Sequence, residues 1–138
     1  MITLKYKRKF KIKKFINIKN EFLGLCQFGF FGIKSLNSVL MTPNQIEESR
    51  RIIIRTTKRI GKVYIRVIFN YVLTSKSQGS RMGKGVGKVK SWITFIKRGS
   101  IFIEMLGISK KLAIKSFKAI KYILPIKVNF IFRDLLTV

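Results

Sequence analysis

A net charge of +25 is spread over 138 residues that are nonetheless 47% hydrophobic and 12% aromatic. Such a charge opposes compaction unless a polyanion neutralises it, and each neutralised phosphate of a nucleic acid releases condensed counterions. A disordered basic tail would be poor in apolar and aromatic residues. We therefore expect one folded domain that carries its charge to a large polyanion.

The polyanion is either a nucleic acid or an anionic membrane surface. No run approaches the ~18 consecutive apolar residues that a spanning helix needs, so we expect no membrane-embedded segment. Basic amphipathic segments also bind anionic lipid, which keeps a protein of the membrane surface as an alternative. A free nucleic-acid-binding protein, such as a nucleoid or RNA-chaperone module, is another.

Catalytic and metal-binding groups are scarce. The chain has no histidine, a single cysteine (Cys26) and five acidic residues, of which only Glu47 and Glu48 are adjacent. The usual general bases and zinc ligands are therefore missing. We expect no enzyme activity, no metal, no cofactor and no small-molecule substrate.

Residues 1–20 read as a basic N-terminal arm, and residues 21–138 as a single domain. Aromatic and aliphatic residues alternate in part with the basic ones, which favours an extended segment laid along RNA. The alternative is a solvated, mobile terminus. The basic residues of the arm are Lys5, Lys7, Arg8, Lys9, Lys11, Lys13 and Lys14.

A first helix is well marked. Thr42 is a good N-cap, Pro43 suits the first helical position and Gln45 sits where a capping box places Glu or Gln. Gly61 is expected to end it. Apolar or small residues recur at helical spacing and predict a buried stripe. These are Ile46, Ile53, Thr57 and Ile60.

Arg51, Arg55 and Arg59 step by four and form one row on a different face of this helix. Such a row is usually a solvated face. Here only Glu47 and Glu48 are near enough to pair with it, so phosphate contact is favoured.

Strands are predicted at 33–40, 62–69, 91–96, 101–106 and 125–132. Gly99 and Ser100 are expected to join 91–96 to 101–106 as a hairpin. A second helix should begin after Ser109 and stop before Pro125, because a proline disfavours helix at the residue before it. Its predicted inward face comprises Leu112, Ser116, Phe117, Ile120, Ile123 and Leu124, with Lys111, Lys115 and Lys118 outside.

Glycines alternate with other residues in the sequence RMGKGVGK at 81–88. Glycine lets a backbone run close to phosphates, and lysines supply point charge. A nucleotide-binding P-loop does not fit, because Lys88 is followed by Val89 rather than Ser or Thr, and by a strand rather than a helix. A flexible hairpin connection and a basic loop inserted among nucleic-acid strands are the readings left open.

Several stretches, in order, resemble the large-subunit ribosomal protein sixteen family of bacteria and organelles. RMGKG followed by an aromatic strand is the most specific of them. The stretches are FGFFGIK at 28–34, LMTPNQIEESRR at 40–51, GKVYIRV at 61–67, RMGKGVGKVKSW at 81–92, IFIEMLGIS at 101–109 and LPIKVNF at 124–130. Residues 68–72 depart from the family, which usually has prolines there, and so does Arg98, where proline often precedes the turn glycine.

The resemblance implies an α+β fold, with two helices packed on a mainly antiparallel sheet. It implies binding to large-subunit rRNA near the peptidyl-transferase centre and the base of the central protuberance, beside neighbouring ribosomal proteins. The glycine-rich loop would project towards A-site tRNA. Its tRNA-proximal residues would be Lys76, Arg81, Met82, Gly83, Lys84, Gly85 and Lys88.

Residues expected to bind rRNA comprise the basic residues of the arm and further cations of the domain. Arg50, Arg51 and Arg66 are included because of their positions in the family motifs, and the others because of their charge and placement. The cations of the domain are Lys34, Arg50, Arg51, Arg55, Arg59, Lys62, Arg66 and Lys90.

The chain favours residues with A/T-rich codons, notably Ile, Lys, Phe and Asn, and prefers Lys to Arg. That usage is typical of an organelle or another AT-rich genome. We expect a mitochondrial ribosomal protein, possibly encoded in the organelle, with a plastid or the bacterial cytoplasm as alternatives.

Overall fold

The computed structural model describes residues 25–83 and 85–133 of the chain. In these ranges the helices are α1 (Pro43–Thr56) and α2 (Lys110–Lys121). The strands are β1 (Phe31–Ser35), β2 (Val39–Met41), β3 (Lys62–Ile65), β4 (Tyr71–Ser75), β5 (Lys88–Ile96), β6 (Ile101–Leu106) and β7 (Val128–Phe132). Every strand pairing among them is antiparallel, and this confirms the expected α+β class.

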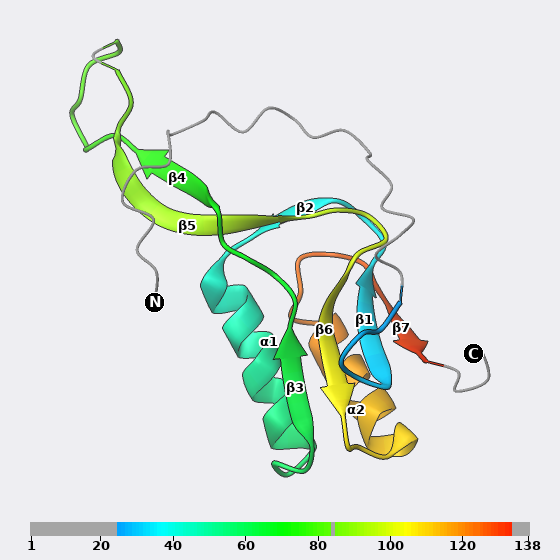
Figure 1. The fold of residues 1–138 in the computed structure, drawn as a ribbon. Coiled ribbons are helices and arrows are strands. Elements are labelled where there is room, and N and C mark those ends of the chain that lie inside the picture. The colour runs from blue at the N-terminus through cyan, green and yellow to red at the C-terminus, as the bar shows by residue number, and fades with distance from the viewer. Residues whose placement is uncertain (1–24, 84, 134–138) are drawn as a thin grey trace.

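Two sheets organise these strands. The larger has the order β3-β6-β1-β7, and the smaller has the order β2-β5-β4. α1 and α2 lie side by side against the larger sheet, whereas the β4–β5 hairpin reaches away from the body (Figure 1). The chain therefore consists of a packed body and a projecting pair of strands, β4 and β5 with the loop between them, which we call the hairpin.

The core lies between the two helices and the larger sheet. Ile46 and Ile53 of α1 and Ile120 of α2 join Ile33 and Phe102 of the sheet, all 1% exposed or less. Burying a large aliphatic or aromatic side chain contributes roughly 1.5–3 kcal/mol. This core fixes α1 against the sheet and so determines which face of α1 meets solvent.

The start of α1 matches the prediction, but its end does not. The Gln45 Oε1 accepts a hydrogen bond from the Thr42 backbone N–H at 2.9 Å, as a capping box requires. The helix ends at Thr56, ahead of Gly61, because Lys58 and Arg59 both adopt positive φ. Thr57 is buried as expected, whereas Ile60 is 54% exposed because it follows this reversal of the chain.

Two predicted strands are each divided in the structure. The strand expected at 33–40 separates into β1 and β2, because the Leu36 N–H donates to Lys127 O and the Ser35 hydroxyl bonds to Asn37 O. The strand expected at 62–69 ends at Ile65. The chain then crosses to the smaller sheet and forms β4, which was not predicted.

The hairpin expected between 91–96 and 101–106 is wrong. β5 pairs with β2 and β4, whereas β6 pairs with β1 and β3. Gly99 and Ser100 do form a turn, in which the Ser100 N–H donates to Lys97 O, but the Gly99 N–H donates to Ser35 O. The turn therefore carries the chain from one sheet to the other instead of folding it back.

The second helix agrees with expectation over most of its length. Ser116, Ile120 and Leu124 are buried, and Lys111, Lys115 and Lys118 are exposed. Leu112 and Phe117 are partly buried against the core. Ile123 is exposed, which corrects its assignment to the inward face, because α2 ends at Lys121 and helical spacing no longer applies there.

Candidate RNA-binding surfaces

The C-terminal half of α1 carries a shallow groove of about 500 Å³, which we call the arginine groove. Five of its six lining residues are cations. Arginine guanidinium groups match the geometry of a phosphate and form two parallel hydrogen bonds with it. The lining residues are Arg50, Arg51, Ile54, Arg55, Lys58 and Arg59.

The chain reversal after α1 completes this groove. Lys58 has a φ of 54° and Arg59 a φ of 65°, a left-handed conformation that costs non-glycine residues roughly 1–2 kcal/mol each. The Arg59 N–H donates to Ile54 O at 2.9 Å, which holds the reversal against the last turn of the helix. The reversal thus places two cations beside Arg55, where they also face the negative end of the helix dipole.

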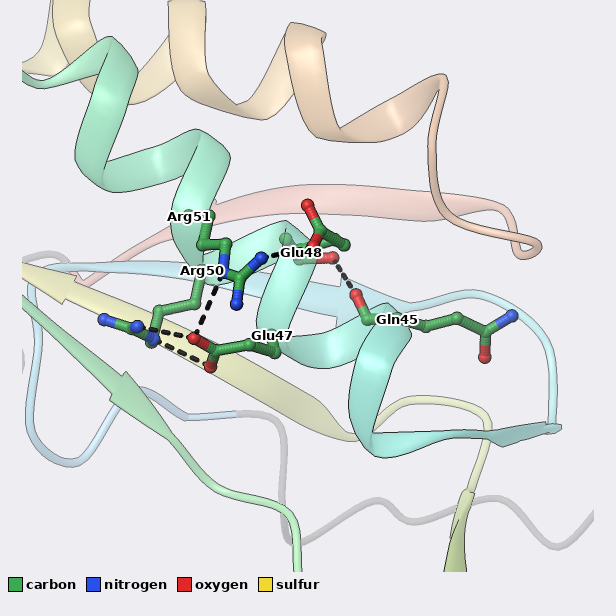
Figure 2. Close-up of polar contacts among 6 residues, drawn as sticks. Gln45, Glu47, Glu48, Arg50 and Arg51 are labelled. Carbon is green, nitrogen blue, oxygen red and sulfur yellow. Dashed lines mark hydrogen bonds and ion pairs between the residues drawn. The ribbon is translucent and has the colours of Figure 1, made fainter. Parts of the chain in front are cut away.

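Carboxylates occupy part of this cationic row, as expected from the sequence. Glu47 accepts hydrogen bonds from Arg50 Nε at 2.9 Å and Arg50 Nη2 at 2.6 Å, and Glu48 accepts one from Arg51 Nη1 at 2.8 Å (Figure 2). The hydrogen bonds from Arg50 lower the pKa of Glu47. These exposed pairs contribute little to stability, but they partly neutralise Arg50 and Arg51.

Arg55, Lys58 and Arg59 differ from these two arginines. Within the described part of the chain, no carboxylate lies within 4 Å of any of the three. All three side chains are exposed. The end of the groove nearest the chain reversal therefore carries positive charge that no described acidic residue compensates. This is the part of the groove that is open to an external anion.

The hairpin carries the second cationic surface. β4 and β5 pair from Tyr71↔Ile93 to Ser75↔Lys88, with a register shift between Leu73 and Thr74. Lys76, Arg81, Lys88 and Lys90 are all exposed along it. The glycine-rich loop expected at 81–88 therefore lies at the tip of a long hairpin, and its last residue, Lys88, forms the final pair of the ladder with Ser75.

Backbone geometry shapes the tip. Gly83 and Gly85 have φ angles of 91° and 76°. Residues with a Cβ atom rarely adopt such values, so these positions favour glycine. The Lys76 Nζ donates to Gly83 O at 2.7 Å and bridges the two sides of the loop. Met82 is 99% exposed, so the tip presents its side chains outward.

Arg66, expected to contact rRNA, is engaged inside the protein. Its Nη1 lies 2.5 Å from Glu104 Oε1 and also donates to Leu25 O at 3.0 Å. Its side chain is only 9% exposed, and Glu104 is fully buried. Arg66 is therefore not part of the exposed cationic surfaces.

The other predicted residues are scattered. Lys62 opens β3 just after the chain reversal and is exposed, while Lys34 is half-buried in β1 beside β7. The basic residues of the arm and Lys84 lie outside the described residues. Most of the predicted cations that the structure describes thus lie in the arginine groove or along the hairpin.

Two features escaped prediction. Lys58 lines the groove because its backbone is left-handed, and no local sequence pattern predicts that conformation. The role of Glu104 had a signal: it is a single acid in the apolar run IFIEML, and such a buried charge needs partners.

No described helix is long and apolar enough to cross a membrane. Among the described residues, no three His, Cys, Asp or Glu side chains come together as metal ligands.

Relatives of the chain were found among known proteins. It is 40% identical over 107 residues to "Large ribosomal subunit protein uL16c" of Emiliania huxleyi, covering 78% of each chain. The protein of the same name from Cyanidium caldarium is 42% identical over 107 residues, 78% of this chain and 76% of the relative. That of Guillardia theta is 41% identical over 106 residues, 77% and 79% of the two chains.

These relatives correct the expected location. The name uL16c denotes the chloroplast-type protein, so the comparisons point to a plastid, and the expectation of a mitochondrial protein is wrong. The preference for residues with A/T-rich codons indicated an organelle or another AT-rich genome, and it did not distinguish a plastid from a mitochondrion.

The family model "Ribosomal protein L16p/L10e" matches residues 3–131, nearly the whole chain. Its members are structural, non-enzymatic proteins associated with the rRNA and proteins of the large ribosomal subunit. With the family motifs lying on the helix, strands and hairpin described above, the chain belongs to the Ribosomal protein L16p/L10e family and is a structural component of the large ribosomal subunit.

Proposed function

We propose that this protein binds large-subunit rRNA near the peptidyl-transferase centre and the base of the central protuberance, using the arginine groove as a principal phosphate-binding surface. Its hairpin tip helps to position A-site tRNA. Cations that touch phosphates fix the placement of the protein without reading sequence.

The observation that carries the proposal is the clustering of Arg55, Lys58 and Arg59 at the open end of the groove. No described carboxylate pairs with them, and strained backbone holds two of the three in place. Strain of this kind persists where the surrounding structure enforces it, and it concentrates at functional sites.

The hairpin supports the tRNA part of the proposal by its shape and charge. It reaches away from the body, so the tip contacts groups that the body does not reach (Figure 1). Arg81 and Lys88 are exposed there, and the glycines leave room for close approach of a phosphate backbone.

The salt dependence of rRNA binding tests the groove. We compare Arg55→Gln/Arg59→Gln with Lys111→Gln/Lys115→Gln, which removes the same charge from the exposed face of α2. The slope of log K against log salt should fall by about one per lost phosphate contact in the groove variant alone. Equal slopes for the two variants would show that net charge, not the groove, determines binding.

A further inference from the structure

A second concavity lies where the hairpin joins the body. β3 pairs with β6 as far as Ile65↔Ile103, and β4 pairs with β5 from Tyr71↔Ile93 onward. The β3–β6 and β4–β5 pairs therefore form one long two-stranded ribbon, whose pairing is interrupted between Ile65↔Ile103 and Tyr71↔Ile93. A hollow of about 340 Å³ opens at the interruption, and we call it the ribbon hollow.

The walls of the ribbon hollow combine apolar and polar groups. Thr94, Ile96 and Ile101 are buried and form its floor. Tyr71 and Phe95 add aromatic rings, while Asn70 and Ser100 add an amide and a hydroxyl. A planar group with apolar faces and a polar edge matches such a lining.

The backbone of the interrupted ribbon adds hydrogen-bonding capacity. The Arg66 N–H donates to Phe102 O at 3.0 Å, which is the last cross-strand bond before the break. Beyond it, no described residue accepts a hydrogen bond from the backbone N–H of Val67 or Ile68. Among the described residues these two donors have no acceptor, so they remain available to a partner that enters the hollow.

The charge around the ribbon hollow favours an anionic chain at its mouth. Lys97 lines it and the exposed Arg98 follows, whereas no carboxylate is among the lining residues. The guanidinium of Arg66 is engaged with Glu104, so Lys97 is the lining cation that remains for a phosphate. A largely apolar floor with a cation at the rim suits a nucleotide, whose base is uncharged and whose phosphate is negative.

We propose that the ribbon hollow holds one unstacked nucleobase of large-subunit rRNA, inserted at the base of the hairpin. The Asn70 amide and the backbone N–H groups meet the edge of the base, and Lys97 meets its phosphate. Proteins read single-stranded RNA in this way, by hydrogen bonds to base edges together with contact to the base face. Pockets for small ligands begin at roughly 300 Å³, and the hollow lies near that limit, so it takes one base.

This inference rests on the proposed rRNA binding, and the experiment separates the two. Large subunits are reconstituted with the full chain as wild type, as Asn70→Ala/Lys97→Ala, and as the matched control Asn129→Ala/Lys115→Ala, whose side chains are exposed elsewhere. Base edges of the rRNA are probed with dimethyl sulfate for A and C and with a carbodiimide for G and U.

We expect one nucleotide to become several-fold more reactive in the hollow variant, with wild-type reactivity in the control and equal incorporation of all three proteins. Equal incorporation with identical reactivity overturns the base pocket and leaves rRNA binding standing. Loss of incorporation in wild type itself would overturn the proposed function.

A second measurement identifies the occupant directly. Ile68 stands at the rim and is 76% exposed, so a photoreactive phenylalanine analogue at this position should not disturb the core. Irradiation of assembled subunits should cross-link it to a single rRNA nucleotide, the same one that the chemical probing reports. A cross-link to a neighbouring protein, or to this chain itself, would overturn the proposal.

Discussion

The Arg66 guanidinium lies 2.5 Å from the Glu104 carboxylate, and the pair is almost entirely shielded from solvent. The same carboxylate accepts hydrogen bonds from the backbone N–H groups of Gln27, Phe28 and Gly29 at 2.7–3.1 Å. A Cβ at Gly29 would lie 2.5 Å from Met105 O, so only glycine lets this segment approach β6 so closely. One buried acid thus ties residues 25–29 and the end of β3 to the sheet.

Glu104→Gln should lower the free energy of unfolding by about 3 kcal/mol, because removing one partner of a buried ion pair leaves the other uncompensated. Urea unfolding followed by circular dichroism measures the loss. The control is Glu48→Gln, whose half-exposed ion pair is worth no more than about 1 kcal/mol. Equal losses for both variants would contradict the structural role of Glu104.

Acidification should destabilise the protein through the same group. Burial raises the pKa of Glu104, but the N–H groups of Phe28, Gln27 and Gly29 and the Arg66 guanidinium outweigh burial and lower it below the ordinary value of 4.5. A carboxyl group whose pKa is lower in the folded chain than in the unfolded chain stabilises the folded state. This stabilisation is fully present at pH values above the unfolded-state pKa, and it is lost as the pH falls through the folded-state pKa.

The free energy of unfolding should therefore decline as the pH falls below 4.5 in the wild type. In Glu104→Gln the decline should be shallower, because the substituted amide does not titrate. Unfolding curves at a series of pH values provide the comparison. Parallel declines in the two proteins would show that other carboxyls cause the acid sensitivity.

Two phenylalanines should differ in their effect on stability. Phe102 is fully buried, so Phe102→Ala should cost about 3–5 kcal/mol. Phe117 is only partly buried and contacts the Phe130 ring at a centroid distance of 5.6 Å, so Phe117→Ala should cost less. Thermal or urea unfolding checks the order, and a larger loss at Phe117 would contradict the packing described for α2.

Arg81→Ala together with Lys84→Ala should leave folding intact and weaken A-site tRNA binding. Arg81 is exposed at the hairpin tip, outside the core, so no packing is lost. Filter binding of tRNA to reconstituted subunits and thermal unfolding of the free protein measure the two effects. Lys118→Ala/Lys121→Ala removes the same charge from α2 and should leave tRNA binding unchanged.

Unchanged tRNA binding by the Arg81→Ala/Lys84→Ala subunits would refute the role assigned to the tip. Unfolding of the free variant would instead contradict its placement outside the core. The two readouts therefore separate a wrong function from a wrong structure.

Local chemistry explains what could be predicted from the sequence. The start of α1 depends on Thr42, Pro43 and Gln45, which act within one helical turn, and the structure has it there. β6 also matches its predicted bounds, because a short run of apolar and β-branched residues between glycines favours a buried strand. The cationic row on α1 followed from spacing alone.

Tertiary structure explains what could not be predicted. Nothing local shows that β5 and β6 belong to different sheets, because strand partners are chosen by residues distant in sequence. Positive φ at Lys58 and Arg59 ends α1 before its glycine, against the preference of both residues. Arg66 looked like an RNA ligand because its buried partner, Glu104, lies 38 residues away.

A map of the assembled large subunit would show which molecule lies against the arginine groove. We predict rRNA phosphates in contact with Arg55 and Arg59, with the hairpin tip directed at the A site. A groove that faces solvent or a neighbouring protein, with no phosphate near either arginine, would contradict the proposed binding of rRNA by the groove.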